Sequence, residues 1–522
     1  MKKLILALAL LMCITLIFTS CDLSEIGDIM GNIGDFDLED LIEGIGGSPN
    51  SNRDEEYSDR YWEETEIAVN RPEEETTGKE ILDVPSYGGD RNSVSMPRLV
   101  GNDYGGEEIL VCHQGGRNPI MSDSGAQRLD VILYQRELRI EEMLNVDILY
   151  ENYVDYSIEN FFGQFRLDVM SGDKNYDLVY GSGYYLTTIA AEGFLEDWND
   201  TSVDLNNGAW YEDAMSQFTT PGGHLHVLAG DGTYDALLSS NVMFFNEDII
   251  ENYNMSSPYT LVRNGDWTLE NMFSMAFKVE NDISGDGITD SYGFIGNNIS
   301  DVSALFCTNT HSLEYQNGAY QFTIGSDRVA SVFEQNYMEV FSGNALYSDR
   351  LWYAGSAFED GITMFSSGNA LFYTDQLFAA DNFSEVSYGV VPFPKADEDT
   401  GKYTSYVNES TKLLAAVVGN YNMDVISDVV DLFGYYGSVD VMPEVCSKYV
   451  NNAHGTQGIM AVRNSLFFDL AEFGICEDIR NSAFSTMLNP QPNGLRNKLV
   501  SLQKKVVTTA NYWSKAIDEI YN

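Results

Sequence analysis

The sequence predicts an α/β protein whose folded part divides into two lobes. From about residue 96 onward, short apolar runs alternate with longer stretches of helical periodicity. This alternation is typical of parallel sheets built from strand–helix–strand units with right-handed crossovers. Hydrophobic residues make up 44% of the 522 residues, which is ample for large cores. The pattern is too long for one simple sheet, so we expect two lobes.

The first strands and helices follow one another closely. We expect strands at 107–113, 146–153 and 176–183, and helices at 124–144, 157–172 and 187–198. In the first of these helices, Leu129, Ile132 and Leu133 stand near helical spacing, which places them on one face. A helical C-terminus is expected over 495–521.

The N-terminus has the pattern of a secretory signal. Lys2 and Lys3 precede an apolar run, residues 4–18, that is shorter than the about 20 residues a membrane-spanning helix needs. The end of this segment, Phe18 to Cys21, resembles the bacterial lipoprotein box, although that box usually has Leu where Phe18 stands. The resemblance implies removal of residues 1–20 and lipidation of Cys21, which would anchor the protein to the outer face of the cytoplasmic membrane. The alternative is an ordinary signal peptide with a chance cysteine.

Charge separates the next segment from the rest of the chain. Between residues 22 and 90 there are 21 acidic and 4 basic residues, interrupted by Gly, Ser, Asn and Pro. Such a segment buries too little apolar surface to offset its ordering entropy, so we interpret 21–95 as a disordered acidic tether. The whole chain has a formal net charge of −51, which is the wrong sign for a nucleic-acid-binding protein.

Cysteine and histidine patterns indicate neither a disulfide scaffold nor a zinc site. Beyond Cys21 there are four cysteines, and none has CxxC or Cys/His spacing. A Cys446–Cys476 bridge is one alternative, and free thiols are favoured. His224 and His226 would share a face on a strand, yet a zinc site needs at least a third ligand from elsewhere.

The order of segments resembles the sugar-type extracellular solute-binding proteins of bacterial ABC importers, the family of the maltodextrin-binding proteins. The matching segments follow the lipoprotein cysteine in order: YDLVYGSGYYLTTIAAEGFLEDWND, NVMFFNEDIIENYNMSSPYTLVRNGDWTLENMFSMAFKV, DISGDGITDSYGF, MFSSGNALFYTDQL and YGVVPFPKADEDTGKYTSYV. They cover most of residues 107 to about 440. Their order carries the resemblance, since no single motif is diagnostic, and the region after Met442 matches less well.

The resemblance implies a two-lobed periplasmic-binding-protein type II fold with interlobe crossing strands and a ligand cleft. One lobe would comprise 96–240 and 393–442, and the other 241–392 and 443–522. The implied function is capture of a small solute, a carbohydrate or oligosaccharide, by hinge closure, followed by delivery to the permease subunits of an ABC transporter. The resemblance implies a monomer that needs no cofactor.

Candidate ligand residues are polar or aromatic and follow expected strands at the edge where such sheets bind ligands. Carboxylates, amides and guanidinium groups suit sugar hydroxyls, and Tyr or Trp rings suit the sugar face. The candidates are Arg117, Tyr184, Tyr185, Tyr234, Asp235, Asn241, Trp352, Tyr353, Asp375, Asn408 and Glu409. Each aromatic candidate has core packing as its alternative role.

An enzyme is the weaker interpretation. The sequence contains no H-E-x-x-H motif and no nucleophile elbow. Paired carboxylates of a glycoside hydrolase remain an alternative in a chain with 80 acidic residues. A surface glycan- or peptide-binding lipoprotein without a transporter is the third hypothesis.

The stretch DISGDGITDSYG partly matches a calcium-binding loop. Asp282, Ser284, Asp286, the carbonyl of Ile288 and Asp290 occupy ligand positions, and Gly287 stands at the turn. The twelfth position, normally a bidentate Glu, is Gly293. A structural calcium site and a metal-free turn therefore both remain open.

Overall fold

The computed structural model describes residues 94–115, 128–153, 156–172, 176–279, 291–344, 346–350, 360–383, 385–419, 422–450 and 452–521. The chain divides into two units, residues 1–79 and 80–522, and everything described belongs to the second. The predicted signal peptide, Cys21 and most of the tether lie outside the described residues. None of the helices in the described ranges is long and apolar enough to cross a membrane.

The first large sheet has the strand order β12-β3-β1-β2. Strands β1, β2 and β3 are parallel, and β12 runs antiparallel to β3. The pairing of β1 with β2 is continuous from Glu107↔Val146 to Gln114↔Tyr153. Their bounds are β1 Glu107–Gln114, β2 Val146–Tyr153, β3 Leu178–Ser182 and β12 Lys412–Ala416. The predicted parallel sheet is confirmed, and β2 has the predicted bounds.

The second large sheet has the order β10-β4-β9-β5-β8. Strands β5, β8 and β9 are parallel, whereas β4 is antiparallel to both β9 and β10. Their bounds are β4 Asn241–Asn246, β5 Tyr292–Gly296, β8 Tyr347–Ser348, β9 Ala370–Gln376 and β10 Tyr388–Pro392. Two short pairs complete the strands, the hairpin of β6 Leu313–Gln316 with β7 Ala319–Phe322, and parallel β11 Ser405–Tyr406 with β13 Leu466–Phe467.

Helices around the first sheet bury apolar faces. Their bounds are α5 Arg128–Leu144, α6 Ile158–Ser171, α7 Gly183–Ala190, α8 Glu212–Phe218, α9 Asp235–Leu238 and α18 Met423–Tyr436. Helix α5 contacts β2 and α18, and its Leu133 and Ile140 are buried. The helix predicted at 187–198 is wrong in its bounds. It begins at Gly183 and ends at Ala190, because the chain then turns through Gly193, whose φ of 78° lies in the left-handed region.

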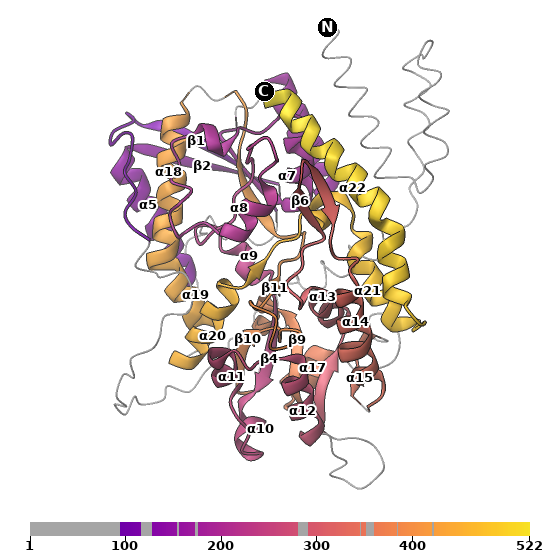
Figure 1. Cartoon of the computed structure of the whole chain (residues 1–522). Coiled ribbons are helices and arrows are strands. Elements are labelled where there is room, and N and C mark those ends of the chain that lie inside the picture. Colours follow the sequence, from indigo (N-terminus) through magenta and orange to yellow (C-terminus); the bar gives the residue numbers. More distant parts are fainter. Residues whose placement is uncertain are drawn as a thin grey trace, which may run out of the picture. The chain divides into compact units, whose positions relative to one another are not determined.

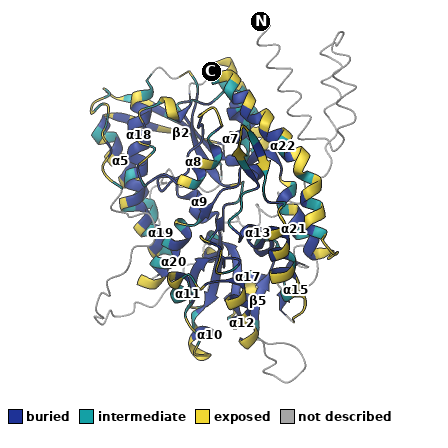
Figure 2. Cartoon of the chain, in the orientation of Figure 1, coloured by how far each residue is buried: buried dark blue, intermediate teal, exposed yellow. Residues whose placement is uncertain are grey.

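The remaining helices lie between β4 and the C-terminus. Their bounds are α10 Glu247–Asn252, α11 Pro258–Asn264, α12 Leu269–Val279, α13 Asn298–Phe306, α14 Asp327–Ser331, α15 Glu339–Ser342, α17 Gly361–Ser366, α19 Met442–Tyr449, α20 Ala453–Arg463, α21 Asp478–Leu488 and α22 Gly494–Tyr521. Shorter 3-10 and π turns occupy Trp198–Asp200, Val332–Met338, Leu377–Asn382, Gly437–Val441 and Ala471–Ile475. The predicted C-terminal helix is confirmed, and Figure 2 shows that α22 exposes one face and buries the other.

The chain passes between the two sheets more than once. It leaves the first sheet through α9 and enters β4 of the second, and it returns between Pro392 at the end of β10 and Lys412 at the start of β12. Later, α18 packs on α5 near the first sheet, and α20 packs on β10 of the second. Figure 1 places α9 and β11 between the sheets, in agreement with their contacts to β12, β4 and α13.

The C-terminal helix contacts elements associated with both sheets. The backbone N of Leu495 donates to Glu334 Oε1, and the Trp513 indole donates to the carbonyl of Thr187 at 2.9 Å. The predicted lobe boundaries stay a prediction. Cys112, Cys307, Cys446 and Cys476 are buried free thiols, as favoured from the sequence.

Candidate functional site

At the first sheet, the carboxyl ends of β1 and β3 and the start of β12 form one edge. The backbone N of Ser182 donates to Gln114 Oε1 at 2.8 Å, which ties the ends of β3 and β1 together. The Lys412 ammonium is buried and donates to the carbonyls of Gln114 and Gly115 at 3.0 and 2.7 Å. This lysine therefore fixes the backbone at the point where β1 ends, and the predicted ligand loop follows.

At the second sheet, the end of β9 and the start of β4 form the corresponding edge. Asn241 pairs with Gln376, and the Asn241 amide donates to Ser303 Oγ at 3.1 Å. The Gln376 side chain donates to the carbonyl of Ser239 at 3.2 Å. The segment that connects the sheets is therefore bonded directly to this edge.

Helix α9 joins the two edges. Asp235 is buried, and its Oδ2 accepts bonds from the backbone N of Lys412 at 2.8 Å and from Thr411 Oγ1 at 3.0 Å. Tyr234, just before the helix, is also buried and has a φ of 38°. Asp235 therefore bonds the crossing segment to the start of β12.

The turn before β12 meets the N-terminus of α7. The backbone N of Tyr184 donates to the carbonyl of Glu409 at 3.2 Å, so these two predicted ligand residues are neighbours. Tyr184 is half-buried, and burial, followed by the nearby charges of Glu477 and Glu409, raises its pKa to about 12. The Asn408 side chain accepts bonds from the backbone N and hydroxyl of Ser410, which shapes the turn.

Beside this turn lies a group that we call the acidic cluster: Tyr406, Glu409, Asp469, Glu472 and Arg480. The Arg480 guanidinium forms an ion pair with Glu409, and its Nε lies 3.8 Å from Glu472 Oε2. The backbone N of Arg480 also donates to Glu472 Oε1 at 3.1 Å. Asp469 and Glu472 are fully buried, and this burial raises the pKa of both carboxyls.

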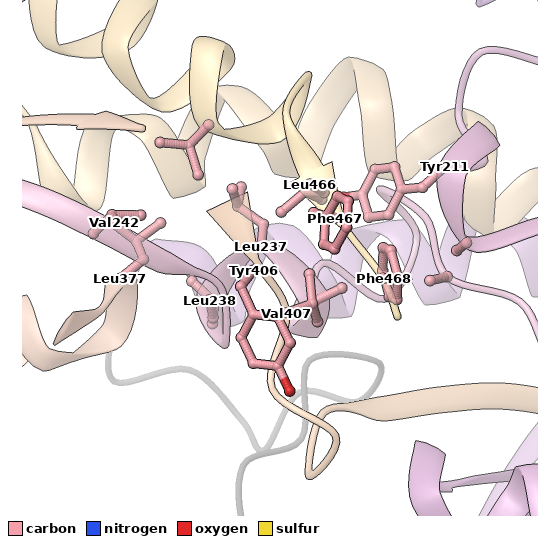
Figure 3. Close-up of a cluster of buried hydrophobic side chains, with 14 of the residues drawn as sticks. Tyr211, Leu237, Leu238, Val242, Leu377, Tyr406, Val407, Leu466, Phe467 and Phe468 are labelled. Atoms are coloured by element: carbon pink, nitrogen blue, oxygen red, sulfur yellow. The ribbon is translucent and has the colours of Figure 1, made fainter. Parts of the chain in front are cut away.

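Tyr406 reaches the acidic cluster from the apolar core between the sheets. Figure 3 shows its ring among the buried side chains of Leu237, Leu238 and Val407, with the hydroxyl pointing away from them. The ring also stacks on Phe306 at a centroid distance of 5.1 Å. Tyr406 is 2% exposed, and its hydroxyl has no hydrogen-bond partner among the described residues.

The structure brings some predicted ligand residues together and separates others. Tyr184, Asp235, Asn408 and Glu409 surround the turn before β12, and Asn241 and Asp375 belong to neighbouring strands at the other edge. Tyr185 turns toward α6, where its ring stacks on Phe162 at 4.9 Å and its hydroxyl bonds Glu159.

Arg117, Trp352 and Tyr353 lie outside the described residues, as do Asp282, Ser284, Asp286, Ile288 and Asp290 of the calcium loop. Ligand binding by all these residues stays a prediction.

Sequence reasoning missed Lys412, Tyr406, Asp469, Glu472 and Arg480. The last three lie in the region after Met442, where the resemblance is weakest. Only the stretch FDLAEFGICEDIR offered a signal. It contains four acids and an arginine, and Asp469 and Glu472 stand among apolar residues that are expected to be buried.

Each histidine of the 224/226 pair contacts an oxygen through its Nδ1. His224 Nδ1 lies 2.7 Å from Asp197 Oδ2, and His226 Nδ1 lies 2.8 Å from the carbonyl of Glu196. Burial lowers the pKa of His226. Within the described ranges no group of three His, Cys, Asp or Glu side chains is placed to hold a metal ion.

A surface hollow of about 430 Å³ lies on α6, lined by Tyr156, Glu159, Asn160, Gly163, Gln164 and Leu167. None of the predicted ligand residues lines it, and its walls come from one helix and the residue shortly before it. The two sheet edges, which gather polar groups from several strands, are the better candidate for a ligand site.

Asp375 should make the protein less stable as the pH rises. Its carboxyl is fully buried, accepts a bond from the Tyr373 hydroxyl, and has its pKa raised by burial to about 7. An accessible aspartate titrates near ~3.9, so from about pH 4 to pH 7 the folded state binds more protons than the unfolded state. Stability contributed by the protonated group is therefore lost as the pH rises through this window.

We expect Asp375→Asn to reduce the difference between the unfolding free energies at pH 5 and pH 7, measured by urea denaturation. The same substitution at exposed Asp266 is the control and should leave that difference unchanged. An unaltered difference in Asp375→Asn would contradict the assignment.

Comparison with known proteins identifies the fold. No family model matches the sequence, and no curated protein matches it. Among solved structures, a cyclo/maltodextrin-binding protein complexed with maltotetraose matches with a TM-score of 0.52 and 14% identity, over 76% of this chain and 97% of that one. The lacto-N-biose-bound binding protein of a Bifidobacterium longum ABC transporter matches with a TM-score of 0.52 and 13% identity, over 79% and 99%.

A third structure agrees with these two. An ABC substrate-binding protein from Listeria monocytogenes in complex with cycloalternan matches with a TM-score of 0.50 and 11% identity, over 76% of this chain and 98% of that one. At these identities the likeness concerns the fold. The fold predicted from the order of segments is confirmed: this chain has the two-lobed periplasmic-binding-protein type II fold shared by these solute-binding proteins.

Proposed function

We propose that this protein is a lipid-anchored extracellular solute-binding protein that captures a carbohydrate or oligosaccharide by hinge closure and delivers it to the permease subunits of an ABC transporter. The observation that carries the proposal is the fold, which extends over nearly the whole length of three proteins whose descriptions name them as sugar-bound or transporter-linked binding proteins. The protein would act as a monomer, held on the outer face of the cytoplasmic membrane through Cys21.

The geometry of the two edges supports capture between them. Lys412 and Gln114 at one edge and Asn241 and Gln376 at the other are linked through the crossing segment that contains α9. A hinge at such crossing segments lets two lobes close on a solute and reopen without disturbing either sheet. Polar groups at both edges would then reach the same bound sugar.

The test is the melting temperature of the full chain, scanned against a panel of oligosaccharides, peptides and polyamines. A solute that binds the folded state alone stabilises it by RT ln(1 + [L]/Kd), about 2.7 kcal/mol when the solute is at 100 times its Kd. We expect one class of oligosaccharide to raise the melting temperature. A response to peptides or polyamines with none to any glycan would overturn the substrate assignment.

The glycoside hydrolase alternative predicts a different outcome in the same samples. Release of reducing sugar during prolonged incubation would favour hydrolysis. We expect the bound oligosaccharide to be recovered intact, because a binding protein must release its solute unchanged.

A further inference from the structure

The acidic cluster contains more negative charge than its own residues neutralise. Glu409, Asp469 and Glu472 contribute three carboxyl groups, and Arg480 contributes one guanidinium. Glu477, which is 55% exposed, adds a fourth carboxylate 3.6 Å from the guanidinium. His311 lies near Asp469, with its Nε2 3.3 Å from Asp213 Oδ1. Burial lowers its pKa, but Asp213 and Asp469 raise it by more, so this imidazole offsets part of the charge on these two acids. A buried excess of this kind is costly unless the acids are protonated or a further cation is present.

Buried polar atoms of the cluster also lack partners. Tyr406 Oη, Asp469 Oδ1 and Glu472 Oε2 are inaccessible to solvent and have no hydrogen-bond partner among the described residues. The charges that act on the Tyr406 hydroxyl are those of Glu472, Glu409, Arg480 and Asp469, so the hydroxyl is directed into the cluster. Unpaired polar atoms beside buried carboxyl groups favour a ligand group that donates hydrogen bonds and carries positive charge.

The donor set favours an organic cation over a metal ion. Across the ranges that the structure describes, no three acidic, histidine or cysteine side chains come close enough together to coordinate a metal. An ammonium group carries one positive charge and three donors, and it does not require a tight coordination shell. The half-buried ring of Tyr184, beside Glu409, offers a surface on which such a cation is also stabilised.

The solvent exposure of the cluster and the net charge of the chain also favour a cationic ligand. Glu409 and Arg480 keep 14% and 18% of their side-chain surface exposed, so the cluster reaches solvent at the edge of the first sheet. The chain's net charge of −51 raises the local concentration of cationic solutes.

We propose that the acidic cluster is a subsite for a primary ammonium group, and that the preferred solute is therefore an amine-bearing saccharide such as a hexosamine oligomer. This inference rests on the proposed function, because it assigns the solute class to the same site. The ammonium contacts Glu409 and the Tyr184 ring at the edge, and the excess negative charge of Glu472 and Asp469 lies behind them.

The test compares two oligosaccharides that differ in one group. Glucosamine and N-acetylglucosamine oligomers of equal length are titrated into the full chain by calorimetry at about pH 6, where such amines are protonated. We expect the amine oligomer to bind at least about tenfold more tightly, which corresponds to ~1.4 kcal/mol. We also expect proton release on binding, measured from the dependence of the heat on buffer, because the buried acids ionise beside the arriving cation.

Substitutions test whether the preference for the amine oligomer and the proton release depend on the acidic cluster. Glu472→Gln keeps the shape of the side chain and should abolish both the preference for the amine and the proton release. Tyr406→Phe removes only a hydroxyl that has no hydrogen-bond partner among the described residues, and it should reduce the preference for the amine oligomer. This variant provides a second test if Glu472→Gln does not fold. Glu142→Gln, on the exposed face of α5, is the matched control and should behave as the wild type.

The outcomes separate this inference from the proposed function. Equal affinity for the two oligomers would overturn the ammonium subsite while leaving sugar binding intact. A preference for the amine that survives both cluster variants would overturn its assignment to these residues. If no saccharide in the panel binds at all, the proposed function itself fails.

Discussion

Replacing Arg350 with Gln is expected to lower the free energy of unfolding by about 3–5 kcal/mol, the usual loss when one partner of a buried ion pair is removed. Arg350 and Asp301 are 3% and 0% exposed, and the Arg350 Nε donates to Asp301 Oδ2 at 2.8 Å. The Tyr337 hydroxyl donates to the same carboxylate at 2.9 Å. Without the guanidinium, the Asp301 charge would stay in the core beside the second sheet with too little compensation.

Urea denaturation of the full chain measures this loss. The control is Arg328→Gln, which breaks the exposed pair with Asp397 and should cost less than about 1 kcal/mol. The double variant Arg350→Met with Asp301→Leu should recover much of the stability, since it leaves no unpaired buried charge. A loss in Arg350→Gln no greater than that in the control would show that the pair is not buried as described.

Replacing Arg480 with Gln is the second large effect that we expect, a loss of about 3 kcal/mol at pH 8. The value lies at the lower end for buried pairs because Arg480 and Glu409 keep some contact with water. In the variant, Glu472 and Glu409 would repel each other without the guanidinium between them. Protonation relieves this repulsion, so the loss should be smaller at pH 5.

The pH dependence distinguishes charge from packing. Burial already raises the pKa of Glu472, and removal of the neighbouring cation raises it further. Denaturation at pH 5 and pH 8 should therefore show different losses for Arg480→Gln. For Arg496→Gln, whose partner Asp327 is 80% exposed, we expect a small loss that is the same at both pH values. Equal losses for Arg480→Gln at both pH values would indicate that it contributes through packing alone.

Local patterns predicted most of the first sheet. The expected strand at 146–153 coincides with β2, and the helix expected at 157–172 differs from α6 by one residue at each end. These elements are specified by apolar periodicity and by short-range signals such as the Ser157 cap. The helix after β3 was misplaced because Ser182 and Gly183 were assigned to the strand, whereas Ser182 is the N-cap of α7 and the helix begins at Gly183.

The candidate site was predictable only in part. Tyr184 and Glu409 could be nominated because each lies next to a strand end, and the structure makes them neighbours. The acidic cluster could not be assembled from the sequence, since Tyr406 and Arg480 are separated by many residues and meet only through tertiary packing. Similarly, the bonds from Thr411 and the backbone N of Lys412 to the Asp235 carboxylate could not be predicted, since they join residues far apart in the sequence.

Hydrogen exchange of the full chain, with and without the oligosaccharide that the melting panel identifies, tests the central claim most directly. If the facing edges hold the solute and the crossing segments are the hinge, backbone amides in 182–185, 235–241, 375–377 and 408–412 should exchange more slowly in its presence. Protection confined to α6 around its surface hollow, or unchanged exchange in all four ranges with the solute bound, would contradict this account.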